Sequence, residues 1–215
     1  MLVACWSAKG GAGTSVVAAA LAVLAGRRSP HGAVARQVGE HGPALLGVPE
    51  PDSPGLTGWL AAGDDVPADA LGRIEVPVTS TLTLLPRGRG GLDARRAGVL
   101  ASVLASGVRP AVADCGGGLG DAVVALAREA DASYLVTRPC YLALRRAHQA
   151  PLAPTGVVLV HEEGRALTRG DVEGAVGTPV VAEVPLDPRV ANAVDAGLLV
   201  RSLPRSLVRA LRHVT

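Results

Sequence analysis

The stretch LVACWSAKGGAGTSVVAAALAVLAG, residues 2–26, decides the predicted fold of this chain. Residues 2–6 form a short apolar run that predicts a buried strand, and the Ala-, Leu- and Val-rich segment 16–26 predicts a buried helix that ends at Gly26. The glycine-rich loop 8–15 joins them. Backbone N–H groups in such a loop and at the following helix N-terminus converge on an anion, so the order strand, glycine loop, helix predicts a phosphate-binding site.

Lys9 lies inside this loop and is the only lysine of the chain, beside twenty arginines. Because arginine serves everywhere else as the generic positive charge, one retained lysine indicates chemistry that needs a compact ammonium on a flexible stem. The alternative is that this one lysine was retained by chance and has no special role. The loop also departs from the usual spelling G-x-x-x-x-G-K-[ST], because Thr14 replaces the lysine that reaches the β- and γ-phosphates. Ser15 keeps the hydroxyl that holds Mg²⁺.

The spelling K-G-G-x-G-x-S resembles the deviant P-loop of the MinD/ParA ATPases, which carry a signature lysine where Lys9 stands. The resemblance implies ATP and Mg²⁺ as cofactors and a nucleotide-sandwich homodimer, in which Lys9 acts in trans as a catalytic residue on the partner's bound phosphates. The TadZ/CpaE branch, associated with Flp-type pili, looks most similar because its members often have a small residue at position 14. The nucleotide-binding residues implied in the loop are Gly10, Gly11, Ala12, Gly13, Thr14 and Ser15.

Strand-like and helix-like patterns alternate along the whole chain, which predicts an α/β fold of three layers: a twisted, mostly parallel sheet with helices on both faces. We expect one P-loop ATPase-like domain spanning residues 1–215. The proline-rich stretch 39–54 is expected to be irregular surface. Strands are expected at 2–6, 33–38, 82–85, 110–114, 133–137, 156–160 and 180–184. Helices are expected at 15–25, 55–62, 92–106, 119–130, 141–149, 168–176, 188–196 and 203–213.

Composition limits the class of protein. Short blocks of Ala, Val and Leu produce the 48% apolar content, as in parallel strands buried on both faces. No run approaches the ~20 apolar residues of a membrane-spanning helix. Cys5, Cys115 and Cys140 lack metal-binding spacing, and the N-terminus lacks the features of a secretory signal, so we expect a cytoplasmic protein. The net charge of +2 argues against DNA as a partner.

Asp114 ends the apolar run 110–114 and precedes a flexible turn that contains three glycines. An acidic residue at a strand end helps to order Mg²⁺ in P-loop proteins, so we predict a metal site formed by Ser15 and Asp114. The alternative is that Asp114 caps the helix that begins near Leu119. The resemblance implies that residues 116–118 sense the γ-phosphate.

The strand predicted at 33–38 lacks the acidic residues that position the attacking water in MinD/ParA ATPases. Gln37 and Gly39 stand where aspartates are expected, and Glu40 is either a displaced substitute or a solvated loop charge. Arg36 is unexpected in an apolar strand. Three explanations of this arginine are open: it contacts the nucleotide, it pairs with an acidic residue, or it shows that the strand lies at the edge of the sheet.

Segment 137–139, with the sequence TRP, follows a predicted strand, at the end where ligands bind in open α/β sheets. Two segments nearer the C-terminus are further candidates. The sequence VPLD, residues 184–187, follows a predicted strand and resembles the adenine-side loop of the family, which makes Pro185 and Asp187 candidate nucleotide ligands; a proline at a strand end without any ligand is the alternative. Segment 202–214 predicts a helix with leucines on one face and arginines on another. Such a helix either contacts a membrane or packs its apolar face on the sheet.

Loss of the lysine at position 14 should weaken nucleotide affinity by about 1.5–3 kcal/mol and slow hydrolysis by roughly 10²–10³. We therefore expect an ATP-binding, nucleotide-responsive dimer with weak or absent hydrolysis that positions or assembles a pilus or another cell-surface machine. It would be cytoplasmic and could lie at the inner face of the membrane. A ParA-like DNA-partition ATPase and a nucleotide-free pseudo-ATPase interaction module remain the alternatives.

Overall fold

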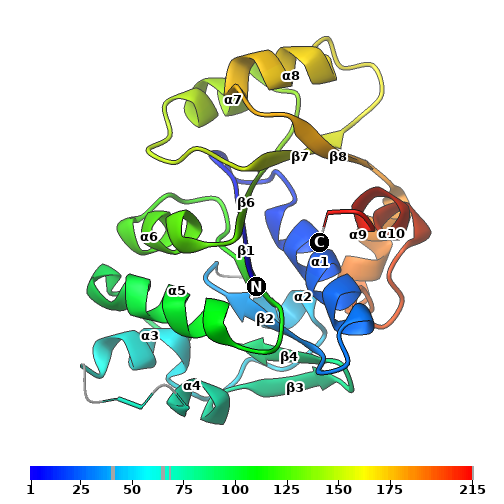
Figure 1. Cartoon of the computed structure of the whole chain (residues 1–215). Helices are drawn as coiled ribbons and strands as arrows, with labels where there is room; N and C mark the ends of the chain where they lie inside the picture. The colour runs from blue at the N-terminus through cyan, green and yellow to red at the C-terminus, as the bar shows by residue number, and fades with distance from the viewer. Residues whose placement is uncertain (40–41, 64–65, 68, 215) are drawn as a thin grey trace.

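The computed structural model describes residues 1–39, 42–63, 66–67 and 69–214. Its middle layer is one sheet of eight strands in the order β3-β4-β2-β5-β1-β6-β7-β8 (Figure 1). Neighbouring strands are parallel except for the antiparallel pair β3–β4 at one edge. This architecture confirms the predicted α/β fold with a mostly parallel sheet.

Seven of the eight strands lie where the sequence predicts them, within two residues. The strands are β1 Leu2–Trp6, β2 Ala33–Gln37, β3 Val76–Thr79, β4 Leu82–Leu85, β5 Ala111–Asp114, β6 Ala132–Thr137, β7 Gly156–His161 and β8 Val180–Pro185. The remaining strand, β3, was not predicted; it is a short edge strand that contains Pro77 and has no buried residue. Proline cannot donate a hydrogen bond to a neighbouring strand and is tolerated at a sheet edge. Because Pro77 interrupts the short apolar segment, the sequence shows no strand pattern there.

Helices cover both faces of the sheet, as predicted. One face is covered by α1 Thr14–Arg28, α2 Gly42–Leu45, α9 Pro188–Asp195 and α10 Arg205–Leu211. The other face is covered by α3 Gly55–Ala61, α4 Ala70–Arg73, the 3₁₀ turn η1 Ala94–Arg96, α5 Ala97–Ser106, α6 Asp121–Glu129, α7 Tyr141–His148 and α8 Arg169–Val176. The single-turn helices α2 and α4 were not predicted, and α2 lies within the stretch expected to be irregular.

Small side chains allow α1 to lie deep in the molecule. It packs against β1, β2, β5 and α10. Gly26 does not end this helix, contrary to the prediction, because α1 continues to Arg28. A Cβ atom at Gly26 would lie 2.4 Å from the backbone oxygen of Thr81, so glycine is required there for the close approach of α1 to the β3–β4 turn.

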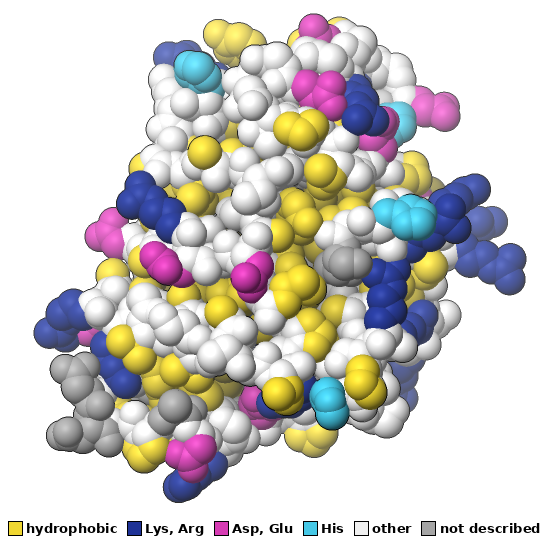
Figure 2. Space-filling model, viewed as in Figure 1, with side chains coloured by type: hydrophobic (Ala, Val, Ile, Leu, Met, Phe, Trp, Pro, Cys, Tyr) yellow, Lys and Arg dark blue, Asp and Glu magenta, His cyan; other side chains and the backbone are white. Residues whose placement is uncertain are grey.

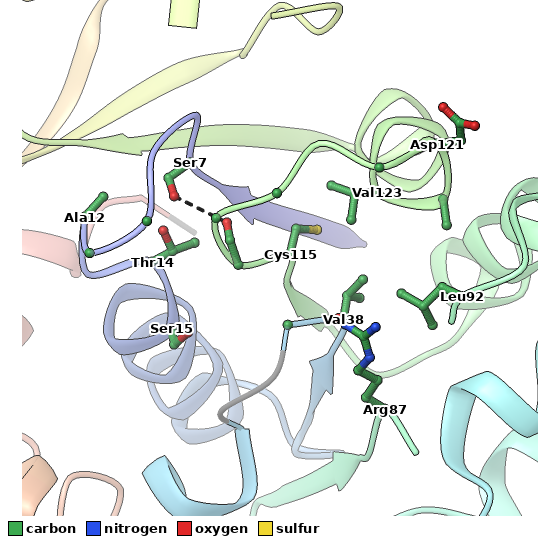
Figure 3. Close-up of a pocket in the computed structure, with 18 of the residues that line it drawn as sticks. Ser7, Ala12, Thr14, Ser15, Val38, Arg87, Leu92, Cys115, Asp121 and Val123 are labelled. Atoms are coloured by element: carbon green, nitrogen blue, oxygen red, sulfur yellow. Dashed lines mark hydrogen bonds between the residues drawn. The ribbon is translucent and has the colours of Figure 1, made fainter. Parts of the chain in front are cut away.

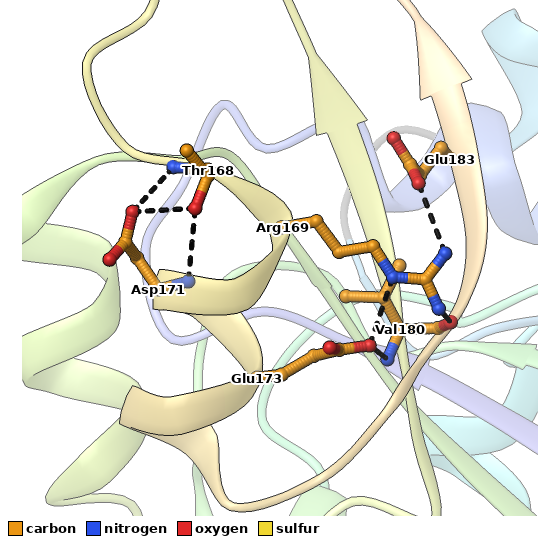
Figure 4. A network of polar contacts seen from close by, with 6 residues as sticks. All are labelled: Thr168, Arg169, Asp171, Glu173, Val180 and Glu183. Atoms are coloured by element: carbon orange, nitrogen blue, oxygen red, sulfur yellow. Dashed lines mark hydrogen bonds and ion pairs between the residues drawn. The ribbon is translucent and has the colours of Figure 1, made fainter.

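A polar network joins α8 to the edge strand β8 (Figure 4). The Arg169 guanidinium contacts Glu173 Oε1 at 3.0 Å and Glu183 Oε1 at 3.2 Å, and it donates to the backbone oxygen of Val180 at 2.8 Å. Thr168 and Asp171 form a capping box at the start of α8. These bonds place charged groups along β8, which protects the exposed strand edge from pairing with another chain.

Arg36 is buried inside the sheet, with 7% of its surface exposed. Its strand, β2, pairs with both β4 and β5, so the edge-strand explanation is wrong. Nε and Nη1 are buried and have no hydrogen-bond partner among the described residues. Burial lowers the pKa of the guanidinium to about 9, while the nearby Glu75 carboxylate raises it and Arg109 lowers it further. The group therefore stays charged at neutral pH in a site that disfavours its charge.

We predict that Arg36→Met stabilises the fold by about 1–3 kcal/mol at pH 7, because an apolar side chain removes a poorly compensated buried charge. Urea unfolding followed by the fluorescence of the buried Trp6 and Trp59 measures the change. A folded-state pKa below the unfolded value means that the wild type gains stability as pH rises through about 9, so the advantage of the variant should shrink above that pH.

Arg145→Met is the matched control, because Arg145 is exposed on α7 and the same replacement there should leave stability unchanged. A lower free energy of unfolding in Arg36→Met would mean that attraction to Glu75 outweighs the burial of the guanidinium.

Candidate functional site

A cavity of about 860 Å³ opens at the carboxyl ends of β1 and β5 (Figure 3). The glycine loop and the start of α1 form one wall, and the turn 115–118 with the start of α6 forms another. Val38, Arg87 and Leu92 close the side farther from the loop. Ligands of open α/β sheets bind at this edge, so the cavity is the principal candidate site.

The glycine loop presents unpaired backbone donors to this cavity. Gly11 and Gly13 have φ angles of 78° and 91°, a left-handed conformation that favours glycine. Gly13 thereby turns the chain directly into α1. The backbone N–H groups of Gly13, Thr14 and Ser15 donate no hydrogen bond to any described residue. Together with the positive end of the α1 dipole, these donors have the chemistry that suits an anion such as a phosphate.

Contacts with the loop after β5 fix the position of the glycine loop. The Ser7 backbone N–H donates to the Gly116 oxygen at 3.0 Å, and the Ser7 hydroxyl lies 3.1 Å from the Lys9 oxygen and 3.3 Å from that of Gly116. A Cβ atom at Gly117 would lie 2.9 Å from Gly10 Cα, so glycine is needed for the two loops to touch. The two loops are therefore in direct contact.

Thr14 and Ser15 begin α1 and both line the large cavity. Ser15 also lines a small recess that contains Gln37 and Asp114, so the structure brings the two predicted metal ligands together. The Asp114 carboxylate accepts a hydrogen bond from Gly116 N–H at 3.0 Å. Gly120 is the N-cap of α6, so the alternative that Asp114 caps this helix is wrong.

The chemistry of the two oxygen donors fits Mg²⁺ bound together with phosphate. Mg²⁺ usually takes one or two protein ligands and completes its octahedron with water and phosphate oxygens. No group of three or more His, Cys, Asp or Glu side chains that could hold a metal occurs in the described part of the chain. Ser15 and Asp114 would therefore need a bound triphosphate to complete the site.

The end of β2 places Gln37 and Gly39 beside Asp114. Gln37 is level with Asp114 on the adjacent strand, and Gly39 N–H donates to the Asp114 backbone oxygen at 2.8 Å. A Cβ atom at Gly39 would lie 3.6 Å from Asp114 Oδ2 and 3.3 Å from the Cα of Gly116. The positions where acids were expected therefore lie at the site and carry no carboxylate, and Glu40 lies outside the described residues.

Lys9 is half-buried and, although it belongs to the loop, is not one of the described residues that line the cavity. The pKa of the Cys140 thiol at the start of α7 is lowered, mainly by a hydrogen bond from Ala143 N–H and more weakly by the charges of Lys9 and Arg165. Lys9 therefore lies near enough to Cys140 for its charge to act on the thiol.

A second cavity of about 280 Å³ adjoins the loop at Gly13 and contains the other two predicted ligands, Pro185 and Asp187. The Asp187 carboxylate is already engaged. It accepts hydrogen bonds from Arg189 N–H at 2.9 Å and from the Ser206 hydroxyl at 2.7 Å, and the latter bond is the main reason for its lowered pKa. Any contact of Asp187 with a ligand would therefore come from its backbone or from a carboxylate already bound to α9 and α10.

Arg138 also lines this second cavity, and the sequence analysis did not select it as a ligand. Its only sequence signal is its place directly after β6, where the carboxyl ends of parallel strands bind ligands.

The last helix, α10, buries its apolar face. Leu207 and Leu211 are fully buried against the sheet, whereas Arg205 and Arg209 are exposed. Of the two alternatives that the sequence left open, α10 therefore follows the second: its apolar face packs on the sheet. Figure 2 shows Lys and Arg side chains gathered on the side of the molecule where α10 lies in Figure 1. Within the described residues, no helix has the length and apolar character needed to cross a membrane.

No protein-family model matches this sequence, and no curated protein matches it. Solved structures do match. A ParA family ATPase from Chlorobium tepidum TLS superposes with a TM-score of 0.82 at 20% identity, over 100% of this chain and 98% of that one.

Two further matches contain nucleotide. The septum site-determining protein MinD from Pyrococcus horikoshii OT3, complexed with Mg-ADP, gives a TM-score of 0.77 at 21% identity, over 98% of this chain and 92% of that one. The ATP complex of a Cyanothece McdA variant gives 0.67 at 16% identity, over 93% and 88%.

These likenesses cover most of each chain. At such identities they are evidence of fold. This chain has the fold of the ParA and MinD P-loop ATPases.

Proposed function

We propose that this protein is a nucleotide-responsive dimer that binds a nucleoside triphosphate with Mg²⁺, ATP being the nucleotide that the resemblance implies. The unpaired N–H groups of Gly13, Thr14 and Ser15 beside a large cavity carry the proposal. Similar folds that hold Mg-ADP in MinD and ATP in McdA support it. Residues 10–15 would surround the phosphates.

Ser15 and Asp114 would hold Mg²⁺, and the bound metal would neutralise charge on the phosphate oxygens. Asp114 would act from the recess that it shares with Ser15. Its bond to Gly116 N–H links the metal site to the turn before α6. A metal-bound triphosphate would therefore pull on that turn, which is the basis for a response to the γ-phosphate.

Hydrolysis would be slow because two groups are missing. Thr14 supplies no cation to the phosphates, and Gly39 supplies no carboxylate to orient a water molecule beside Asp114. Each loss removes an interaction that is stronger in the transition state than in the bound nucleotide. The two losses would weaken nucleotide binding less than they slow hydrolysis, so the nucleotide-bound state would be long-lived.

The position of Lys9 supports a role in a dimer. Lys9 is half-buried in the loop and is not among the described residues that line the large cavity. In a nucleotide-sandwich homodimer it would reach the phosphates of the partner and compensate in part for Thr14. Dimerisation would then depend on the nucleotide.

The output we propose is the positioning or assembly of a pilus or another cell-surface machine, as in the TadZ/CpaE branch, by a cytoplasmic protein. Because the apolar face of α10 is buried, contact with the inner face of a membrane would use the exposed arginines of this helix. The same exposed arginines are the observation that favours a second candidate, ParA-like binding of DNA. Steep loss of DNA binding with salt would support that candidate.

Replacement of Thr14 by lysine should strengthen Mg-ATP binding about ten- to hundredfold, because Thr14 lines the cavity and a longer side chain would add a charge-assisted contact to phosphate. Titration calorimetry compares the variant with the wild type. Thr14→Met, similar in length and uncharged, is the control and should gain nothing. Equal affinity in Thr14→Lys, or no binding by either protein, would contradict the phosphate site.

Lys9→Ala should abolish nucleotide-dependent dimerisation and keep most of the affinity of the monomer for Mg-ATP. Light scattering with and without Mg-ATP measures the mass, and Lys9→Arg tests whether an ammonium is needed rather than a charge. We expect the wild type alone to double its mass on addition of nucleotide. A Lys9→Ala protein that dimerises as the wild type does would overturn the trans role.

Gly39→Asp in the Thr14→Lys background should raise ATP turnover at least tenfold, because it returns a water-positioning carboxylate beside Asp114. The Cβ atom requires a shift of a few tenths of an ångström at Gly116. Phosphate release measures the rate. Gly39→Asn, with the same shape and no base, is the control, and equal rates in the two variants would contradict the assignment.

A further inference from the structure

Arg87 is the only cationic side chain among the described residues that line the large cavity. It is half-buried on the side farther from the glycine loop, and Figure 3 shows it extending from the end of β4 toward Val38. Within the described part of the chain, no carboxylate forms an ion pair with this guanidinium. Asp93, which also lines the cavity, is bound to Arg95 instead. The charge of Arg87 is therefore available to an anionic ligand.

The backbone of Arg87 is fixed by contacts with α3. Its carbonyl oxygen accepts hydrogen bonds from the N–H group of Thr57 at 2.7 Å and from the hydroxyl of the same residue at 2.8 Å. Gly88 follows with a φ angle of 80°, and a Cβ atom there would collide with the backbone oxygen of Pro54. Because α3 and its N-cap hold the backbone on both sides, the guanidinium is presented from a rigid support.

The side chain of Arg87 keeps donors for a ligand. Nη1 donates to the Val38 oxygen at 2.7 Å, and Nη2 donates to the Gly90 oxygen at 3.3 Å. A guanidinium has more N–H donors than these two bonds use, and neutral carbonyls do not cancel its charge. Nε has no partner among the described residues and is not one of the buried unpaired atoms, so it is accessible.

The bond to Val38 also places the guanidinium close to the proposed metal site. The N–H groups of Val38 and Gly39 both donate to the backbone oxygen of Asp114, at 2.9 and 2.8 Å. Arg87 therefore lies across the end of β2 from Asp114, whereas the backbone donors of residues 13–15 lie on the other side of the cavity. A volume of about 860 Å³ is near the upper end of the ~300–1,000 Å³ typical of ligand sites, which leaves room for an oxyanion at each wall.

We propose that Arg87 forms a second oxyanion-binding site in the large cavity, opposite the backbone donors of the glycine loop. Two sources of the oxyanion share this chemistry: the terminal phosphate of a nucleoside triphosphate, and a separate small oxyanion beside a bound nucleotide. The first source rests on the proposed nucleotide binding. With either source, Arg87 supplies from the same chain a cation that Thr14 does not supply.

Titration calorimetry with Mg-ATP and Mg-ADP tests the first source. Arg87→Met should bind Mg-ATP about ten- to hundredfold more weakly than the wild type and should keep its affinity for Mg-ADP, because only the contact to the terminal phosphate is lost. Arg89→Met is the matched control, since Arg89 belongs to the same loop, is exposed and is not among the described residues that line the cavity. Its affinities for both nucleotides should equal those of the wild type.

Phosphorus NMR with inorganic phosphate tests the second source in protein saturated with Mg-ADP. The wild type and Arg89→Met should broaden the phosphate resonance, and Arg87→Met should not. Loss of phosphate binding together with an unchanged ratio of ATP to ADP affinity identifies a separate oxyanion. A lowered ratio identifies the terminal phosphate.

Arg87→Lys separates the charge from the tie between the loop and β2. It loses the paired bonds to Val38 and Gly90 but keeps a cation, so it should retain at least part of the oxyanion binding that Arg87→Met loses. Circular dichroism checks that both variants are folded. Equal losses in the two variants would mean that the tie to Val38 matters rather than the charge, and would overturn the inference.

The outcomes distinguish this inference from the proposed function. If Arg87→Met matched the wild type in both experiments, the second oxyanion site would be wrong and nucleotide binding would stand. If the wild type bound neither nucleotide, the proposed function would fail. Phosphate titration of the nucleotide-free protein would then decide the Arg87 site: weaker binding by Arg87→Met would support it, and equal binding would overturn it.

Discussion

The left-handed conformation of Gly13 is the constraint on which the candidate site depends. With φ at 91°, this residue turns the chain from the glycine loop straight into α1, and any side chain there would strain the turn. The turn aims the first N–H groups of α1 into the large cavity, where no described residue accepts from them. It also brings Val160 close to Gly13, so the same residue borders the second cavity. The two cavities therefore meet at one glycine.

Packing around α1 makes this arrangement rigid. Small side chains and the close approach at Gly26 allow α1 to lie against the centre of the sheet. Ser7 and Gly117 then hold the glycine loop against the turn after β5, which carries Asp114. The groups that would bind phosphate and metal are thus fixed by glycines and backbone hydrogen bonds rather than by long side chains. Such a site is formed before its ligand arrives.

The sequence predicts the parallel sheet and the glycine loop well, because both depend on local patterns: short apolar runs, and glycines between a strand and a helix. It does not predict β3, whose Pro77 interrupts any run, or single-turn helices such as α2. Position in the sheet also requires the structure. In the sequence, Arg36 is compatible with an edge strand, whereas in the structure β2 lies between β4 and β5.

The same difference between local patterns and long-range contacts explains which features of the site the sequence did not predict. The place of Asp114 at a strand end predicts a metal ligand. The alternative role, as the cap of the next helix, is excluded only by the structure, in which Gly120 is the N-cap of α6. Arg138 gave little signal, because its place in the second cavity depends on residues of α1, β8, α9 and α10 that lie far from it in the sequence. Burial and cavity walls are made by long-range contacts, which a single sequence does not display.

A crystal structure grown with excess nucleoside triphosphate and Mg²⁺ tests the central claim most directly, namely that the glycine loop and the first turn of α1 bind phosphate. Phosphate oxygens should lie within about 3.2 Å of the backbone nitrogens of Gly13, Thr14 and Ser15, with the metal between Ser15 and Asp114. An empty cavity at saturating nucleotide, or phosphates bound away from these nitrogens, would contradict the account.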